Sequence, residues 1–202
     1  HCTRYRMVLF TPADVDLPRG APALRRRFLD RAIFNRRPGY LAEALAFEEA
    51  LRRRNALLRA HGQRCDPVLL GSYDVPFSSA AARLACRRRD FVAEVADTFG
   101  RVFGELHGGD PAPPGALEYR STVPGVEQGD PPEAVAQALR ELLQRHRRRD
   151  MERRTTTVGP QRDDLLMTLG GRLLKEHASQ GQHRLFVLAL KITEIETLRT
   201  LG

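Results

Sequence analysis

The 202-residue sequence contains no tryptophan, and aromatic residues make up only 6% of it. Proteins that hold single-stranded nucleic acid by base stacking need an aromatic platform, so this mode of binding is not expected. Lysine is also nearly absent, because only two of the 33 basic residues are lysines, which leaves 31 arginines. Any contact with a nucleic acid would therefore be made mainly by arginine, to the phosphate backbone.

Cysteine is scarce too. Cys2, Cys65 and Cys86 lie far apart and never form a Cys-x-x-Cys pair. This pattern favours reduced, structural thiols over a disulfide framework or a zinc site. The six histidines include no His-Glu-x-x-His motif and no metal-ligand spacing from a cysteine. We therefore expect no metal site built by this chain alone.

Long apolar runs are missing, since no stretch approaches the roughly 18 residues that span a membrane. The chain opens without a basic and then apolar leader, so we expect a cytoplasmic protein that does not contact a membrane. With 42% hydrophobic and 29% charged residues, the composition is that of an ordinary soluble protein. The chain begins at His1 and stops soon after an apolar helical run, so both ends look cut from a longer protein.

What the sequence has in excess is positive charge. The net charge is +8 and the pI is near 10.2, which makes a polyanion partner plausible, although a genomic bias towards arginine codons explains the excess equally well. Arg25, Arg26 and Arg27 fall in the first turns of a predicted helix, where positive charge opposes the helix dipole. A binding role or a solvated charged face would account for them.

The pattern of apolar residues predicts an α-rich α/β protein. The expected helices are Pro22–Asn35, Tyr40–Ala60, about Ser79–Leu106 and one that begins at Pro132. The expected strands are Arg6–Phe10, Leu117–Thr122, Thr155–Val158 and a final hairpin that turns at Gly170 and Gly171 and returns along Arg172–His177.

Two of these helices are predicted to form an arm. The apolar seams of Tyr40–Ala60 and Ser79–Leu106 have matching periods, and a turn-rich loop containing Pro67, Gly71 and Pro76 separates them. Such helices are expected to pack against each other as an antiparallel, coiled-coil-like pair. Arg54 and Arg88 interrupt the two seams.

The segment Ala178–Arg184, ASQGQHR, comes directly before the most apolar helical run. A helix start leaves several backbone N–H groups without intrahelical acceptors, and the helix dipole adds partial positive charge there. Ser179 and the residues after it therefore suit an anion such as phosphate. The alternative is that Ser179 only caps a core helix and Gly181 allows a close approach.

Adjacent carboxylates occur at Asp163 and Asp164, next to Arg162. They would serve as an acid/base or metal cluster, although a surface ion pair at a turn is the more frequent outcome.

Four blocks in this order resemble the RecF family, the recombination-repair members of the ABC-type ATPases related to SMC heads. The blocks are FTPADVDLPRGAPALRRRFLD from Phe10 to Asp30, RRRNALLR from Arg52 to Arg59, TTTVGPQRDDL from Thr155 to Leu165, and ASQGQHRLFVLALKITEIE from Ala178 to Glu196. The family usually has His at the position of Gln161, and often Gln or Arg at that of His183.

The resemblance implies part of an ABC/SMC-type ATPase head with an inserted antiparallel helical arm. Residues 1–20 would end the N-terminal lobe of the head, residues 21–107 would form the arm, and residues 108–202 would form the C-terminal part of the head. In such ATPases the signature loop reaches the terminal phosphate of ATP on the other subunit, and here that loop would be Ser179, Gln180, Gly181 and Gln182. Residues near the head interface or the nucleotide would be Gly159, Gln161, Arg162, Asp163, Asp164 and Arg184, and candidate DNA contacts are Arg25, Arg26, Arg27, Arg52 and Arg53.

The implied cofactors are ATP and Mg²⁺. The implied partners are DNA at gaps or junctions, a second copy of the protein when ATP is bound, and the mediator proteins RecR and RecO. The whole protein would be a weak DNA-dependent ATPase that aids recombinase loading at gaps. This chain alone is not expected to hydrolyse ATP, because its lysines, Lys175 and Lys191, each follow a leucine and not the glycine of a phosphate-binding Gly-Lys-Ser/Thr motif.

Two other interpretations stay open. The chain could be a non-enzymatic helical adaptor or DNA-backbone-binding module. It could also be another SMC relative, but those proteins have much longer arms than residues 40–106 allow.

Overall fold

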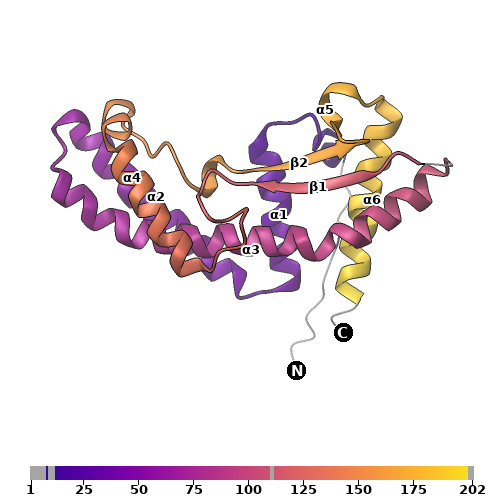
Figure 1. Cartoon of the computed structure of the whole chain (residues 1–202), viewed down its shortest axis with the longest axis horizontal. Coiled ribbons are helices and arrows are strands. Elements are labelled where there is room, and N and C mark those ends of the chain that lie inside the picture. Colours follow the sequence, from indigo (N-terminus) through magenta and orange to yellow (C-terminus); the bar gives the residue numbers. More distant parts are fainter. Residues whose placement is uncertain (1–7, 9–11, 110–111, 200–202) are drawn as a thin grey trace. The chain divides into compact units, whose positions relative to one another are not determined.

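The computed structural model describes residue 8 and residues 12–109 and 112–199. Its helices, in chain order, are η1 (Pro12–Asp16), α1 (Pro22–Arg36), α2 (Tyr40–His61), η2 (Gly62–Arg64), α3 (Pro67–His107), α4 (Pro132–Arg153), η3 (Pro160–Arg162), α5 (Leu174–His177) and α6 (Gln180–Arg199). Its strands are β1 (Gly115–Arg120), β2 (Asp164–Leu169) and β3 (Arg172–Leu173). Figure 1 labels most of these elements along the chain.

The chain divides into two compact units, each made of separate segments. The first unit contains residues 1–38, 90–119 and 164–202, and the second contains residues 39–89 and 120–163. Helix α1 thus falls in the first unit and α4 in the second. The functional division into residues 1–20, 21–107 and 108–202 that the resemblance implies stays a prediction.

The first unit contains a three-stranded sheet with the strand order β1-β2-β3. Strand β2 pairs antiparallel with β3, with Thr168 opposite Leu173. Helix α6 is fixed by an aromatic cluster in which the Phe186 ring lies 4.7 Å from Phe99 and 5.4 Å from Phe103. Gly115 opens β1 against this cluster, since an added Cβ would come within 2.7 Å of the Phe103 ring. The cluster therefore places the start of α6.

In the second unit, α2 and the first part of α3 form an antiparallel pair. The sequence predicts Ser79–Leu106 as the partner of α2, but residues 90–106 belong to the first unit. Glu43 of α2 pairs with Arg87 at 3.2 Å, and the rings of Phe47 and Phe77 lie 5.8 Å apart. At the other end of the pair, buried Leu58, Cys65 and Leu70 form one apolar cluster.

Several predicted elements need correction. Helix α3 begins at Pro67, where a loop to about Ser79 was expected, and Pro76 lies inside it. The backbone N–H of Val68 donates to the Asp66 carboxylate at 2.8 Å, so an Asp-Pro cap starts the helix. The predicted strand Arg172–His177 is shorter in the structure: only Arg172–Leu173 form β3, and Leu174–His177 form α5. All of the predicted strand Arg6–Phe10 except Val8 lies outside the described residues.

The expected strand at Thr155–Val158 is absent from the described structure, because side chains take the place of a strand partner. The Thr156 N–H donates to Asn55 Oδ1 at 2.8 Å, and the Thr157 N–H donates to Asp150 Oδ1 at 2.9 Å. These bonds satisfy backbone donors that a neighbouring strand would otherwise pair.

No helix within the described residues is both long enough and apolar enough to cross a membrane.

Candidate functional site

The start of α6 is closed by a reciprocal pair of hydrogen bonds. The Gln182 N–H donates to Ser179 Oγ at 3.2 Å, and the Ser179 N–H donates to Gln182 Oε1 at 2.8 Å. This is a capping box, in which the residue before the helix and the third helical residue satisfy each other's donors. The first-turn N–H groups of Gln180 and Gly181 have no acceptor within the helix. The two bonds thus fix the loop and leave a pair of outward donors.

The residues of this loop face outward. Ser179, Gln180, Gly181 and Arg184 are exposed, and Gln182 is half-buried. An added Cβ on Gly181 would find only the Ser179 hydroxyl, at an unstrained 3.8 Å. Gly181 is the second residue of α6 and carries no side chain, so the backbone of the first turn is accessible from outside.

His183 points inward from the same turn. It is buried, and the Arg19 guanidinium donates from Nε to its Nε2 at 3.1 Å. Burial, and secondarily the charge of Arg19, lower the pKa of His183 below its usual value. The imidazole is therefore neutral and acts as an acceptor for Arg19, so it supports the loop and does not face a ligand.

The two adjacent carboxylates serve different partners. Buried Asp163 accepts hydrogen bonds from Ser121 Oγ at 2.8 Å and from the Thr122 N–H at 2.7 Å. Asp164 forms a two-pronged ion pair with Arg25, with Nε–Oδ1 at 2.7 Å and Nη2–Oδ2 at 2.8 Å. Neither the two aspartates nor any other His, Cys, Asp or Glu residues that the structure describes gather into a group able to hold a metal ion.

The turn that begins at Gly159 is folded onto itself. Gly159 has φ +121°, and an added Cβ there would lie 2.9 Å from the Phe77 ring, so only glycine fits. Gln161 donates from Nε2 to the Val158 carbonyl at 2.8 Å, which directs its side chain into its own loop. Arg162 is exposed at the surface of this turn.

The candidate DNA contacts separate into two groups. Arg25 is only 5% exposed and is held by Asp164, so its predicted contact with DNA does not fit this structure. Arg27 is exposed and Arg26 is half-buried. Arg52 and Arg53 are exposed, and both pair with Glu49 on the same helix face.

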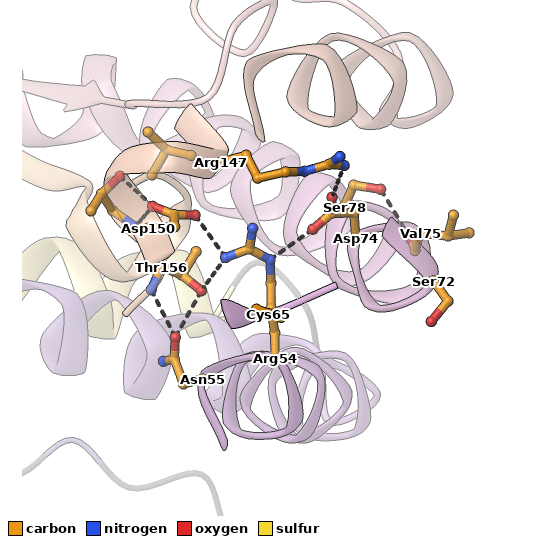
Figure 2. A network of polar contacts seen from close by, with 12 residues as sticks. Arg54, Asn55, Cys65, Ser72, Asp74, Val75, Ser78, Arg147, Asp150 and Thr156 are labelled. Carbon is orange, nitrogen blue, oxygen red and sulfur yellow. Dashed lines mark hydrogen bonds and ion pairs between the residues drawn. The ribbon is translucent and has the colours of Figure 1, made fainter. Parts of the chain in front are cut away.

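Sequence reasoning missed the two buried arginines that organise the second unit. Arg54 is fully buried and binds Asp74 at 2.8 Å, Asp150 at 2.7 Å and the Thr156 hydroxyl at 2.7 Å, as Figure 2 shows. Arg88 is also buried and donates to the Pro160 carbonyl at 3.0 Å. These are the two arginines that interrupt the helical seams. Their positions in otherwise apolar seams could have indicated buried ion pairs, because a charge buried without a partner is strongly destabilising.

Known proteins are similar to this chain in sequence and in fold. No protein-family model matches the chain. The DNA replication and repair protein RecF of Myxococcus xanthus (strain DK1622) is 44% identical over 196 residues, which cover 95% of this chain and 50% of that protein. RecF of Anaeromyxobacter dehalogenans (strain 2CP-C) is 47% identical over 193 residues, which cover 95% of this chain and 50% of that protein.

Two solved structures share the fold. One is the recombination mediator protein RecF bound to ATPrS in the RecFOR pathway, with a TM-score of 0.88 and 24% identity, covering 96% of this chain and 52% of that one. The other is the same mediator with ATP, with a TM-score of 0.87 and 25% identity, covering 96% of this chain and 51% of that one. These matches confirm the α-rich α/β fold class. The chain is similar to RecF over almost all of its own length and spans about half the length of the curated relatives that it matches.

Proposed function

We propose that this chain, as a homologue of one half of RecF, forms part of an ATP-dependent DNA-repair protein, and that its Ser179–Gln182 loop binds the terminal phosphate of ATP held by a second subunit. The observation that carries the proposal is the preformed, exposed helix start closed by the Ser179–Gln182 capping box. Phosphate is the anion that such a helix start suits best.

The chemistry of the loop fits a phosphate that arrives from outside. The Ser179 hydroxyl accepts from the Gln182 N–H, so its own hydrogen stays available to donate to a phosphate oxygen. The exposed Arg184 lies one turn further along α6 and adds positive charge near the same surface. The exposed Gly181 permits the close approach that the phosphate needs.

A second subunit is part of the proposal because the loop resembles the signature loop of ABC-type ATPases, which reaches ATP held by the other subunit. Mg²⁺ would be held with the ATP by segments other than those described here. The whole cytoplasmic protein would bind gapped or junction DNA as an ATP-linked dimer, work with RecR and RecO to aid recombinase loading, and hydrolyse ATP slowly.

Sedimentation of the full-length protein with and without ATP tests this proposal. Ser179→Asp keeps an oxygen that caps the helix but places a negative charge against the phosphate, so ATP-dependent dimers should be lost. Ser179→Thr keeps both the cap and the hydroxyl and should dimerise like the wild type. Ser179→Arg adds a bulky side chain to the loop and should also lose the ATP-dependent dimers. Its control is Ser72→Arg, on an exposed face of α3, which should behave like the wild type. Normal dimers with Ser179→Asp or with Ser179→Arg would refute the assignment.

A further inference from the structure

The second half of α4 is unusually rich in arginine. Six arginines and two carboxylates lie between Arg145 and Arg154. Favourable interaction with the helix dipole falls off within the last turn, so it accounts for the arginines nearest the end of α4 at Arg153 and not for Arg145 or Arg148. These two need another explanation.

The structure sorts this segment into an inward and an outward face. Asp150 is fully buried and holds Arg54, while Arg147 is half-buried and makes a longer contact of 3.4 Å with Asp74. Arg148 points outward, with 92% of its side chain exposed, and forms a surface pair with Glu152. Arg145 is exposed, and no carboxylate partner for it occurs among the described residues.

The outward face lines an open groove of about 570 Å³ between η2 and α4. Its lining residues are Gln63, Gln144, Arg145, Arg147, Arg148, Met151 and Glu152. The lining of the groove therefore consists mainly of guanidinium and amide groups, with one carboxylate, one thioether and no aromatic ring.

Buried contacts hold the helix that carries the groove. On one side of α4, Asp150 is locked to Arg54 of α2 at 2.7 Å. Met151 packs against the apolar cluster of Leu58, Cys65 and Leu70. Because buried contacts fix both the helix and its neighbour, the outward arginines sit on a surface whose shape is set before any ligand arrives.

We propose that this groove binds the phosphate backbone of DNA, and that Arg145 and Arg148 are its main contacts. The inference rests on the DNA binding proposed above and adds a location for it. Arginine and glutamine donors match phosphate oxygens, and the lack of aromatic rings excludes base stacking here. Protein-binding surfaces are enriched in aromatic anchors, which this groove lacks, so an acidic protein is the less fitting ligand.

The test measures binding of a short DNA duplex to the full-length protein over a range of salt concentrations. The variant Arg145→Ala/Arg148→Ala should lower the slope of log affinity against log salt by about 2 and weaken binding at least tenfold at about 0.1 M salt, because two phosphate contacts are lost. The matched variant Arg83→Ala/Arg101→Ala removes the same charge from exposed arginines of α3 that do not line the groove, and should change the slope less.

The outcomes separate the location from the function. Wild-type protein that does not bind the duplex would refute the proposed DNA binding itself. Wild-type binding with an unchanged slope in Arg145→Ala/Arg148→Ala would overturn the groove alone and leave an acidic protein as its ligand. Because both arginines are exposed, the variant should fold normally, which an unchanged thermal melting curve would verify.

Discussion

The buried clusters that hold α6 and α4 differ in chemistry, although the first unit also buries ion pairs such as Arg25–Asp164. In the first unit, the fully buried rings of Phe99, Phe103 and Phe186 pack beneath the start of α6. In the second unit, the largest fully buried side chain is the charged Arg54, which lies between the carboxylates of Asp74 and Asp150. Apolar packing is non-directional and tolerates adjustment, whereas a buried ion network depends on each partner. The proposed phosphate loop thus follows from an apolar cluster that tolerates adjustment, and the proposed DNA groove lies on a helix held by a buried ion network that tolerates little.

The largest expected effect comes from removing one carboxylate of the ionic core. Asp150→Asn takes a charge away from Arg54 and turns an amide donor towards donors that Asp150 now accepts from, such as the Thr157 N–H. It should destabilise the second unit by about 3 kcal/mol. Urea unfolding of the full-length protein, with hydrogen exchange of α4 to locate the change, measures it.

Asp97→Asn is the matched control, because Asp97 is exposed on α3. Its effect should stay within about 0.5 kcal/mol. An equally small effect of Asp150→Asn would mean that the ionic core contributes little to the second unit.

A smaller effect is expected when one aromatic ring of the apolar cluster is replaced by a smaller apolar side chain. Phe186→Leu keeps an apolar side chain against Phe99 and Phe103, and neighbouring rings can shift to fill most of the lost volume. The expected destabilisation is about 1 kcal/mol, seen as faster hydrogen exchange in α6. A loss larger than that of Asp150→Asn would reverse the comparison between the two cores.

The smallest expected effect is a pH dependence of stability, which should appear in the first unit. The pKa of His183 is lowered by burial, so the unfolded chain binds a proton more readily than the native one as the pH falls. The first unit should therefore lose stability as the pH falls below about 6.5, the ordinary pKa of a histidine in an unfolded chain. His183→Gln keeps an acceptor for Arg19 and should remove this dependence, which hydrogen exchange of α6 at several pH values would detect. The same pH response in His183→Gln would assign it to another group.

Helices were easier to predict from the sequence than the residues that join them. The apolar periods gave both ends of α1 and α2 to within a residue and the start of α4, because each helix buries one face along its length. The start of α3 was missed because Pro67 and Pro76 suggest a loop, whereas Pro67 begins the helix behind the Asp66 cap.

The loop before η3 could not be predicted because its partners are distant in sequence. Thr155–Val158 has the composition of a strand, yet Asn55 and Asp150 supply the acceptors for its backbone. The loop Ser179–Gln182 was predicted as a helix start from local residues alone, since a capping box needs only four neighbouring positions. The arginine groove depends on how α4 meets η2, which no local pattern contains.

The central claim is that the Ser179–Gln182 loop touches the terminal phosphate of ATP on another subunit. The most direct measurement is photo-crosslinking of the full-length protein with an ATP analogue that carries an aryl azide on its terminal phosphate, followed by mass spectrometry of the peptides. We expect a crosslink to the peptide containing residues 178–184 when the protein is concentrated enough to dimerise, and its loss on dilution to monomer. A crosslink to this peptide in the monomer, or its absence from dimers labelled elsewhere, would contradict the claim.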